Sequence, residues 1–231
     1  GQDIINFDLA LSGTSILLTS GNLQVQENID INGLGADLLE IDGNGGSIFS
    51  FSGAGSSKTF NVIDITLTNA VNVLNLAGSG DDTLNVSGII ARNNADPNSA
   101  GSVMVGSFCT INITNSAFVE NNHSIVLDLS TANANIVNTT FSNNQNHAIS
   151  IFPGGGFSGN TTTISITNVT FADNGGGGVT SRAIPSGTTL AINYQNSIFN
   201  NHGNGSFNAA GTISGSLVIT SQNHNILDDT P

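Results

Sequence analysis

A short pattern of alternating apolar and polar residues recurs through the second half of the chain. Each copy carries an Asn three positions before a large apolar residue, and the copies occupy residues 111–121, 134–144, 164–174, 192–201 and 219–226. The large apolar residues are Phe118, Phe141, Phe171, Phe199 and Ile226, which follow one another at intervals of 23, 30, 28 and 27 residues. Alternation within each copy indicates strands, and an interval of about 20 to 50 residues is typical of a solenoid.

The first half of the chain continues the alternation in a less regular form. Residues 4–76 contain short runs such as FNVIDITL, separated by Gly- or Asn-rich breaks such as GNGG. This is the pattern of strands of about 3 to 6 residues joined by turns. Residues 84–94 align with 111–121 and place Ala91 in the Phe position. Because each coil repeats the direction of the last, we predict an all-β parallel solenoid of about 8–10 coils, with residues 1–231 as one domain.

Stacking the copies in register predicts three inward columns of side chains. The Phe residues fill the centre of the stack. A first Asn column lies at one corner, where each amide is expected to be buried and to bond the next coil: Asn115, Asn138, Asn168, Asn196 and Asn223. A second Asn column, Asn121, Asn144 and Asn174, closes the corner after the Phe. We interpret all three columns as structural, because they recur in every coil whereas a functional site is local.

Charge narrows the range of partners. The chain has 3 Lys and Arg residues against 16 Asp and Glu residues, for a formal net charge of −13. Three cations cannot supply the phosphate contacts of a nucleic-acid-binding protein, and anionic membranes are disfavoured for the same reason. A polyanionic glycan would need a bridging cation such as calcium. The remaining partners are a glycan or a cell-surface protein.

Cysteine content and hydropathy add little to this picture. The single cysteine, Cys109, lies in an apolar run and is expected to be a small buried residue without a disulfide. No apolar run is long enough to span a bilayer. Residue 1 leads directly into strand-like sequence without a signal peptide, as expected for a mature or excised part of a larger secreted protein.

The repeated F-x-x-N phrase and the Gly-rich run at 175–178 resemble the repeats of chlamydial polymorphic outer-membrane proteins. They also resemble bacterial secreted right-handed parallel β-helix proteins more widely. Residues 3–45 are similar to the start of the β-helix in CSLREA-type bacterial surface proteins, where it follows a capping segment that is missing here. The resemblance implies a right-handed parallel β-helix and a secreted or cell-surface location. It leaves the chemistry open, since the fold also hosts lyases, polygalacturonases and epimerases.

Two places in the sequence are candidate metal sites. AGSGDDTLN at 77–85 is similar to the calcium-binding nonapeptide of RTX proteins, and would use Asp81 and Asp82 as ligands. The alternative is a Gly-Asp turn that leads into a strand at Leu84. His123 and His147 occupy equivalent positions in adjacent coils and could share a transition metal, although no third ligand is evident. The alternative is a solvent-facing pair at a corner.

Candidate catalytic residues for glycan cleavage are few. Glu120 and Asp173 fall in one column two coils apart with Asn143 between them, which implies a separation of about 9 to 10 Å, at the outer edge of the range for inverting glycosidases. Arg182, in TSRAIPSG, resembles the Arg of lyase motifs, but the second Arg of those motifs is absent. His202-Gly203 and the Asp81-Asp82 pair resemble parts of polygalacturonase motifs whose remaining residues are missing.

The sequence therefore favours a non-enzymatic extracellular or surface module, either adhesin-like or a structural stalk. The alternatives are a polysaccharide-acting lyase, hydrolase or epimerase, and a carbohydrate-binding β-helix without catalysis. Aromatic side chains along one exposed face would favour binding. Tyr194 falls on an inward position, whereas Phe157 and Phe207, in Gly-rich loops, are the best candidates for exposure. The alternative is that these two residues pack within their loops.

Overall fold

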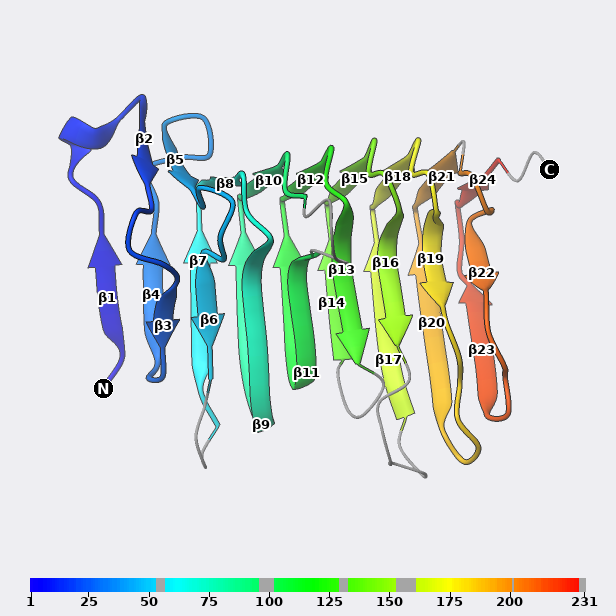
Figure 1. The fold of residues 1–231 in the computed structure, drawn as a ribbon. Coiled ribbons are helices and arrows are strands. Elements are labelled where there is room, and N and C mark those ends of the chain that lie inside the picture. Colours follow the sequence, from blue (N-terminus) through cyan, green and yellow to red (C-terminus); the bar gives the residue numbers. More distant parts are fainter. Residues whose placement is uncertain (53–56, 96–101, 129–132, 153–160, 201, 229–231) are drawn as a thin grey trace.

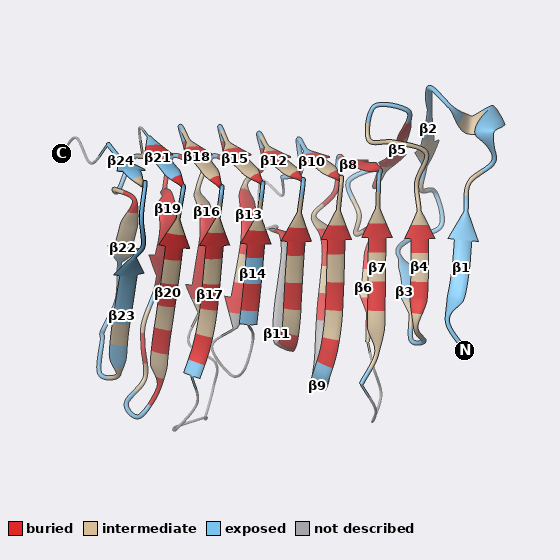
Figure 2. Cartoon of the chain, turned by 180° about the vertical axis from the view of Figure 1, so that it is seen from behind, coloured by how far each residue is buried: buried red, intermediate tan, exposed pale blue. Residues whose placement is uncertain are grey.

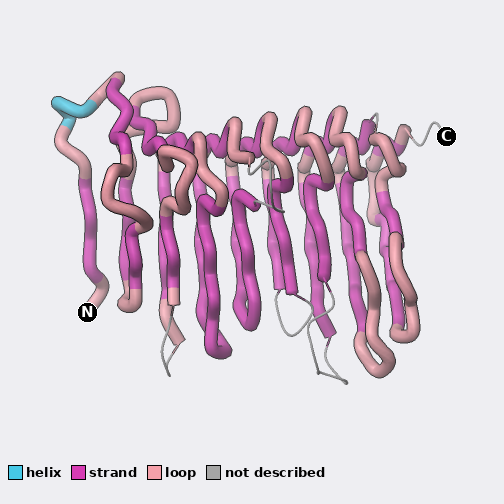
Figure 3. Tube along the Cα trace, in the orientation of Figure 1, coloured by secondary structure: helices cyan, strands magenta, loops and turns pink. Residues whose placement is uncertain are grey.

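The chain forms a right-handed parallel β-helix, as predicted, in a computed structural model that describes residues 1–52, 57–95, 102–128, 133–152, 161–200 and 202–228 (Figure 1). The coils stack into a rod with the first and the last strands at opposite ends. The solenoid makes about seven turns, and its shorter sheet contains nine strands stacked along the axis. Both numbers are close to the predicted 8–10 coils. One short 3-10 helix, η1 (Leu9–Leu11), interrupts the strands near the N-terminus (Figure 3).

Three faces make up each coil, and all the paired strands are parallel. The first face consists of β1 (Asp3–Asn6), β4 (Ile29–Asn32), β7 (Thr59–Ile63), β14 (Asn133–Val137), β17 (Thr161–Thr167), β20 (Thr189–Gln195) and β23 (Ser216–Ser221), with the C-terminal halves of β9 (Asn72–Ser87) and β11 (Ser102–Thr114).

The second face is a separate sheet of nine short strands. These are β2 (Thr14–Leu17), β5 (Leu39–Asp42), β8 (Thr66–Thr68), β10 (Ile90–Arg92), β12 (Ala117–Val119), β15 (Thr140–Ser142), β18 (Thr170–Ala172), β21 (Ile198–Asn200) and β24 (Ile226–Leu227).

The third face returns the chain to the start of the next coil. It consists of β3 (Leu23–Val25), β6 (Phe49–Phe51), β13 (His123–Asp128), β16 (His147–Phe152), β19 (Gly177–Ser181) and β22 (Phe207–Ala209), with the N-terminal halves of β9 and β11. β9 and β11 continue from the third face to the first without interruption, so both faces belong to one sheet.

The predicted Phe column forms the centre of the rod. Neighbouring rings are stacked with centroids 4.9 Å apart for Phe118 and Phe141, 5.1 Å for Phe141 and Phe171, and 4.5 Å for Phe171 and Phe199, and all four side chains are fully buried. Alternating buried residues along the strands give the striped pattern of Figure 2. The last position of the prediction is wrong, because Phe199 pairs with Leu227 and Ile226 lies beside Ile198.

The second Asn column is buried and links four coils. It begins at Asn94, which the alignment of residues 84–94 with 111–121 places beside Asn121, and each Asn hydrogen-bonds the next along the rod. The Oδ1 atom of Asn144, for example, accepts hydrogen bonds from the backbone N–H of Asn121 at 3.1 Å and from its Nδ2 at 3.3 Å. Nδ2 of Asn144 donates to the Phe118 carbonyl at 3.2 Å. This column therefore satisfies backbone groups that the corner would otherwise leave buried without partners.

The first Asn column is exposed, so its predicted inward position is wrong. Asn115, Asn138, Asn168 and Asn196 have φ angles of 50° to 55°, in the left-handed region that Asn tolerates better than most residues. Their side chains are exposed at the corner, and the first three bond along it: Asn138 Nδ2 donates to Asn115 Oδ1 at 3.3 Å, and Asn168 Nδ2 donates to Asn138 Oδ1 at 3.1 Å. In the last copy the left-handed position is taken by His224, with a φ of 63°, instead of Asn223.

Candidate functional sites

The register places His123 and His147 side by side on β13 and β16, as their equivalent sequence positions predict. Their ring centroids are 5.8 Å apart. His123 is only 4% exposed, so the alternative of a solvent-facing pair is wrong for this residue. Burial, and then the positive charges of His147 and Arg182, lower the pKa of His123 to about 4. Burial also lowers the pKa of His147. Both imidazoles are consequently neutral at pH 7, the form that binds metals.

The two histidines differ in their hydrogen bonds. His147 Nδ1 lies 2.9 Å from Thr180 Oγ1, whereas His123 Nδ1 is buried without a partner. In the next coil Gly177 pairs with His147 and supplies no side chain. Within the part of the chain that the structure describes, no three His, Cys, Asp or Glu side chains gather where they could hold an ion. The transition-metal site stays a prediction.

Asp81 and Asp82 lie within β9, so this segment is a strand and not the Gly-Asp turn considered above. Asp81 is exposed and Asp82 is 1% exposed, because successive side chains of a strand point to opposite sides. Asp82 Oδ1 accepts a hydrogen bond from the backbone N–H of Lys58 at 2.8 Å. Cys109 pairs with Asp82, and burial, with a smaller contribution from the Asp82 charge, raises the pKa of its thiol to about 12. Since the two carboxylates face opposite sides, only one of them can serve a given cation, and the calcium site stays a prediction.

Glu120, Asn143 and Asp173 form the column that the repeat predicts, at the corner between the second and third faces. All three are exposed and have φ angles between 53° and 57°. Arg182 comes after the last residue of β19, at the other end of the third-face strands, and its guanidinium lies 4.5 Å from the centre of the Phe152 ring. The structure therefore separates the candidate carboxylates from Arg182.

The aromatic candidates pack inward where the structure describes them. Tyr194 is 6% exposed, as predicted, and its ring centroid is 4.9 Å from that of Phe207. Phe207 lies in β22, instead of in a loop, and also contacts Phe199 at 4.8 Å between centroids. Phe157 lies outside the described residues.

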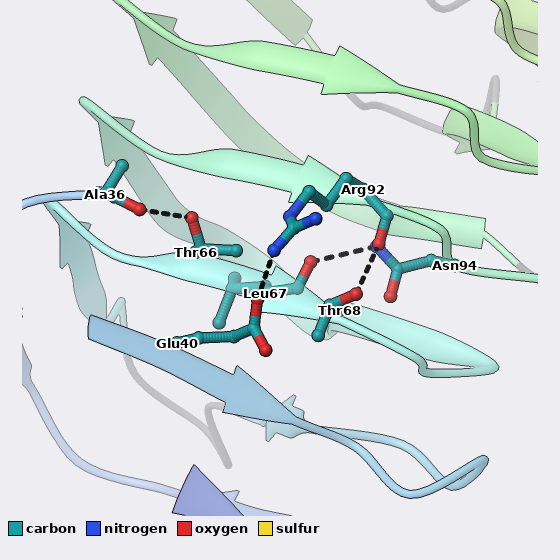
Figure 4. A network of polar contacts seen from close by, with 7 residues as sticks. All are labelled: Ala36, Glu40, Thr66, Leu67, Thr68, Arg92 and Asn94. Atoms are coloured by element: carbon teal, nitrogen blue, oxygen red, sulfur yellow. Dashed lines mark hydrogen bonds and ion pairs between the residues drawn. The ribbon is translucent and has the colours of Figure 1, made fainter. Parts of the chain in front are cut away.

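Sequence reasoning missed a polar pocket on the outer surface of the second face. Arg92 of β10 extends across β8 to Glu40 of β5, and its Nη2 atom lies 2.6 Å from Glu40 Oε2 (Figure 4). Thr66 of β8 pairs with Glu40 on one side and with Ile90 on the other, and it donates a hydrogen bond to the Ala36 carbonyl at 2.5 Å. The two charged residues are 52 positions apart, and only the register of three coils brings them together.

No known protein family, curated protein or solved structure matched the chain in comparisons of its sequence and its fold. Among the described residues, no helix is both long and apolar enough to cross a membrane.

Proposed function

We propose that the chain is a non-enzymatic module of a bacterial secreted or cell-surface protein, acting as a rigid spacer or adhesin-like stalk. The observation that carries this proposal is the continuous buried Asn column from Asn94 to Asn174, in which every pair of neighbouring coils is joined by amide hydrogen bonds. Such a column, beside the Phe stack, makes the coils one cooperative rod.

The location of the recurring polar residues supports a structural role. The residues that recur from coil to coil either bond the next coil inside a corner or occupy left-handed positions outside one. The nine strands of the second face, at a spacing of about 4.8 Å, give a rod about 40 Å long. The repeats resemble those of chlamydial polymorphic outer-membrane proteins and of CSLREA-type proteins, and this resemblance supports a surface location.

Charge supports a neutral partner over a polyanionic one. Lys58 and Arg92 are already paired with Glu27 and Glu40, at 2.7 and 2.6 Å, and Arg182 lies against Phe152. With a net charge of −13, the module is expected to bind a neutral glycan or a cell-surface protein, and not nucleic acid.

The test is to incubate the protein with a panel of neutral and acidic polysaccharides, with and without calcium, and to follow release of reducing or unsaturated ends. We expect no release from any member. Cleavage of any polysaccharide would contradict the proposal. Loss of that cleavage in Glu120→Gln would favour a hydrolase, and its loss in Arg182→Gln would favour a lyase. Binding of a polysaccharide without its cleavage is expected for an adhesin-like role.

A further inference from the structure

The pocket around Glu40 and Arg92 has a volume of about 400 Å³, within the range of about 300 to 1,000 Å³ that is usual for small-molecule sites. Its floor is the outer surface of β5, β8 and β10. Its walls are the start of β2, with Thr14, and the segment before β5, with Asp37 and Leu38. The pocket therefore combines three successive coils of the second face with two segments that project beyond it.

These projecting segments cover a surface that is open elsewhere along the rod. Thr140 and Thr170, at equivalent outward positions of later coils, are partly exposed. Thr66, the corresponding residue in the lining of the pocket, is only 3% exposed. The floor of the pocket is thus sheltered by the chain itself, which distinguishes this site from the regular repeat.

Hydrogen bonds hold the polar groups of the floor in place. The Arg92 guanidinium is fixed by Glu40, and the Thr66 hydroxyl donates to the Ala36 carbonyl. Thr68, which does not line the pocket, donates its hydroxyl to the backbone carbonyl of Arg92 at 2.9 Å and so joins β8 to β10 (Figure 4). The Arg92 and Glu40 side chains are 49% and 24% exposed, so the remaining guanidinium N–H groups and the second carboxylate oxygen can reach a ligand.

The chemistry of the lining selects among ligand classes. An anion would meet the carboxylates of Asp37 and Glu40 against one guanidinium, in a chain of net charge −13. Calcium takes about 6 to 8 oxygen ligands and would be repelled by Arg92. A neutral molecule with several hydroxyl groups fits best, because the lining offers donors and acceptors together with the apolar side chains of Leu38 and Ile90.

We propose that this pocket binds a neutral sugar residue. Arg92 and Glu40 hydrogen-bond adjacent hydroxyl groups of the sugar, Asp37 and Thr14 contact its edge, and Leu38, which is 39% exposed, packs against its C–H surface. The bound sugar would be one unit of a glycan that continues into solvent, since the pocket lies on the side of the rod.

An NMR titration of the ¹⁵N-labelled protein tests this assignment, with cellobiose, lactose and chitobiose as neutral probes and galacturonic acid as the anionic control. We expect at least one neutral sugar to shift the amide signals of residues 13–15, 36–40 and 90–92, and galacturonic acid to leave them unchanged. The absence of shifts with all three neutral sugars would overturn the proposal, as would shifts confined to another face. Release of reducing ends in the same samples would contradict the non-enzymatic function and leave the pocket assignment standing.

Two variants locate the sugar. Arg92→Gln should weaken binding about tenfold or more, the factor expected when a hydrogen bond to a charged group is lost. The protein should still fold, because partly exposed ion pairs contribute little to stability, and an unchanged thermal midpoint checks this. Leu38→Glu keeps the Arg92–Glu40 pair and should abolish binding. The control is Arg182→Gln, an exposed arginine on the third face, which should bind as the wild type does. Equal affinity in all four proteins would overturn the proposal.

Discussion

Replacement of Asn144 by Ala should reveal how strongly the buried Asn column holds the coils together. The change removes the acceptor of the Asn121 backbone N–H, and a buried donor without a partner costs about 1 to 3 kcal/mol. It also removes the bonds from Nδ2 of Asn144 to the Phe118 carbonyl and to Asn174 Oδ1, each contributing about 1 kcal/mol. The free energy of unfolding should therefore fall by about 3 to 5 kcal/mol, measured by urea denaturation with an unchanged m-value.

The matched control is Asn138→Gly, in the exposed column. Gly adopts the left-handed conformation of this position, where φ is 50°, and Gly88 occupies the same column with a φ of 65°. The variant loses amide contacts to Asn115 and Asn168 that are open to water, so the cost should be below about 1 kcal/mol. Equal losses in Asn144→Ala and Asn138→Gly would refute the distinction between a buried and an exposed column.

Three further changes test other parts of the structure. Phe141→Ala interrupts the ring stack between Phe118 and Phe171 and should lower the free energy of unfolding by about 3 to 5 kcal/mol in the same assay, and a loss below about 1 kcal/mol would contradict the packing. Gly203→Ala would place a Cβ atom 2.0 Å from the Gly175 carbonyl oxygen, so it should lower the thermal midpoint, whereas Gly1→Ala, with nothing within 4 Å, should not. The pKa of His123 is lowered from its ordinary value of 6.5 to about 4 in the folded protein. Between pH 6.5 and pH 4, the unfolded chain therefore binds more protons than the folded protein does. The stability contributed by neutral His123 should accordingly be complete above pH 6.5 and fall by about 2 to 3 kcal/mol as the pH drops to 4. His123→Gln should show less of this loss than the wild type, and identical pH dependence of the two proteins would contradict the burial of the ring.

The regular coils could be predicted from the sequence because their period is expressed in large side chains. Phe118, Phe141, Phe171 and Phe199 mark the core, and the Asn three residues after each of the first three marks the buried corner. His202 occupies the same place after Phe199. Spacing alone was sufficient here, since a ring stack and an amide column both need the same residue at the same height in every coil.

Sequence reasoning failed where one residue type serves two purposes. Asn138 and Asn144 recur equally well, yet Asn138 is selected for a left-handed backbone and Asn144 for hydrogen bonding inside the corner. Only the path of the chain distinguishes them. The last copy contains one additional residue, so Leu227 lies beside Phe199 where Ile226 was expected. Because both residues are apolar, the sequence does not reveal this shift.

The pocket on the second face was invisible for a different reason. Glu40 and Arg92 lie in the less regular coils, and neither belongs to a motif. Their contact depends on Glu40 pairing with Thr66 and on Ile90 pairing with Thr66 from the other side. The candidate histidines, by contrast, follow the repeat closely enough for their contact to be predicted.

The most direct test of the central claim, that the buried Asn column ties the coils into one rod, is hydrogen exchange of the Asn side-chain amides measured by NMR. The Nδ2 protons of Asn121 and Asn144 are buried and bonded to the Ala91 and Phe118 carbonyls, so they should exchange only when the rod unfolds globally. Those of Asn138 and Asn168 are exposed and should exchange rapidly. Rapid exchange of Asn121 and Asn144, at the rate of the exposed column, would contradict the account.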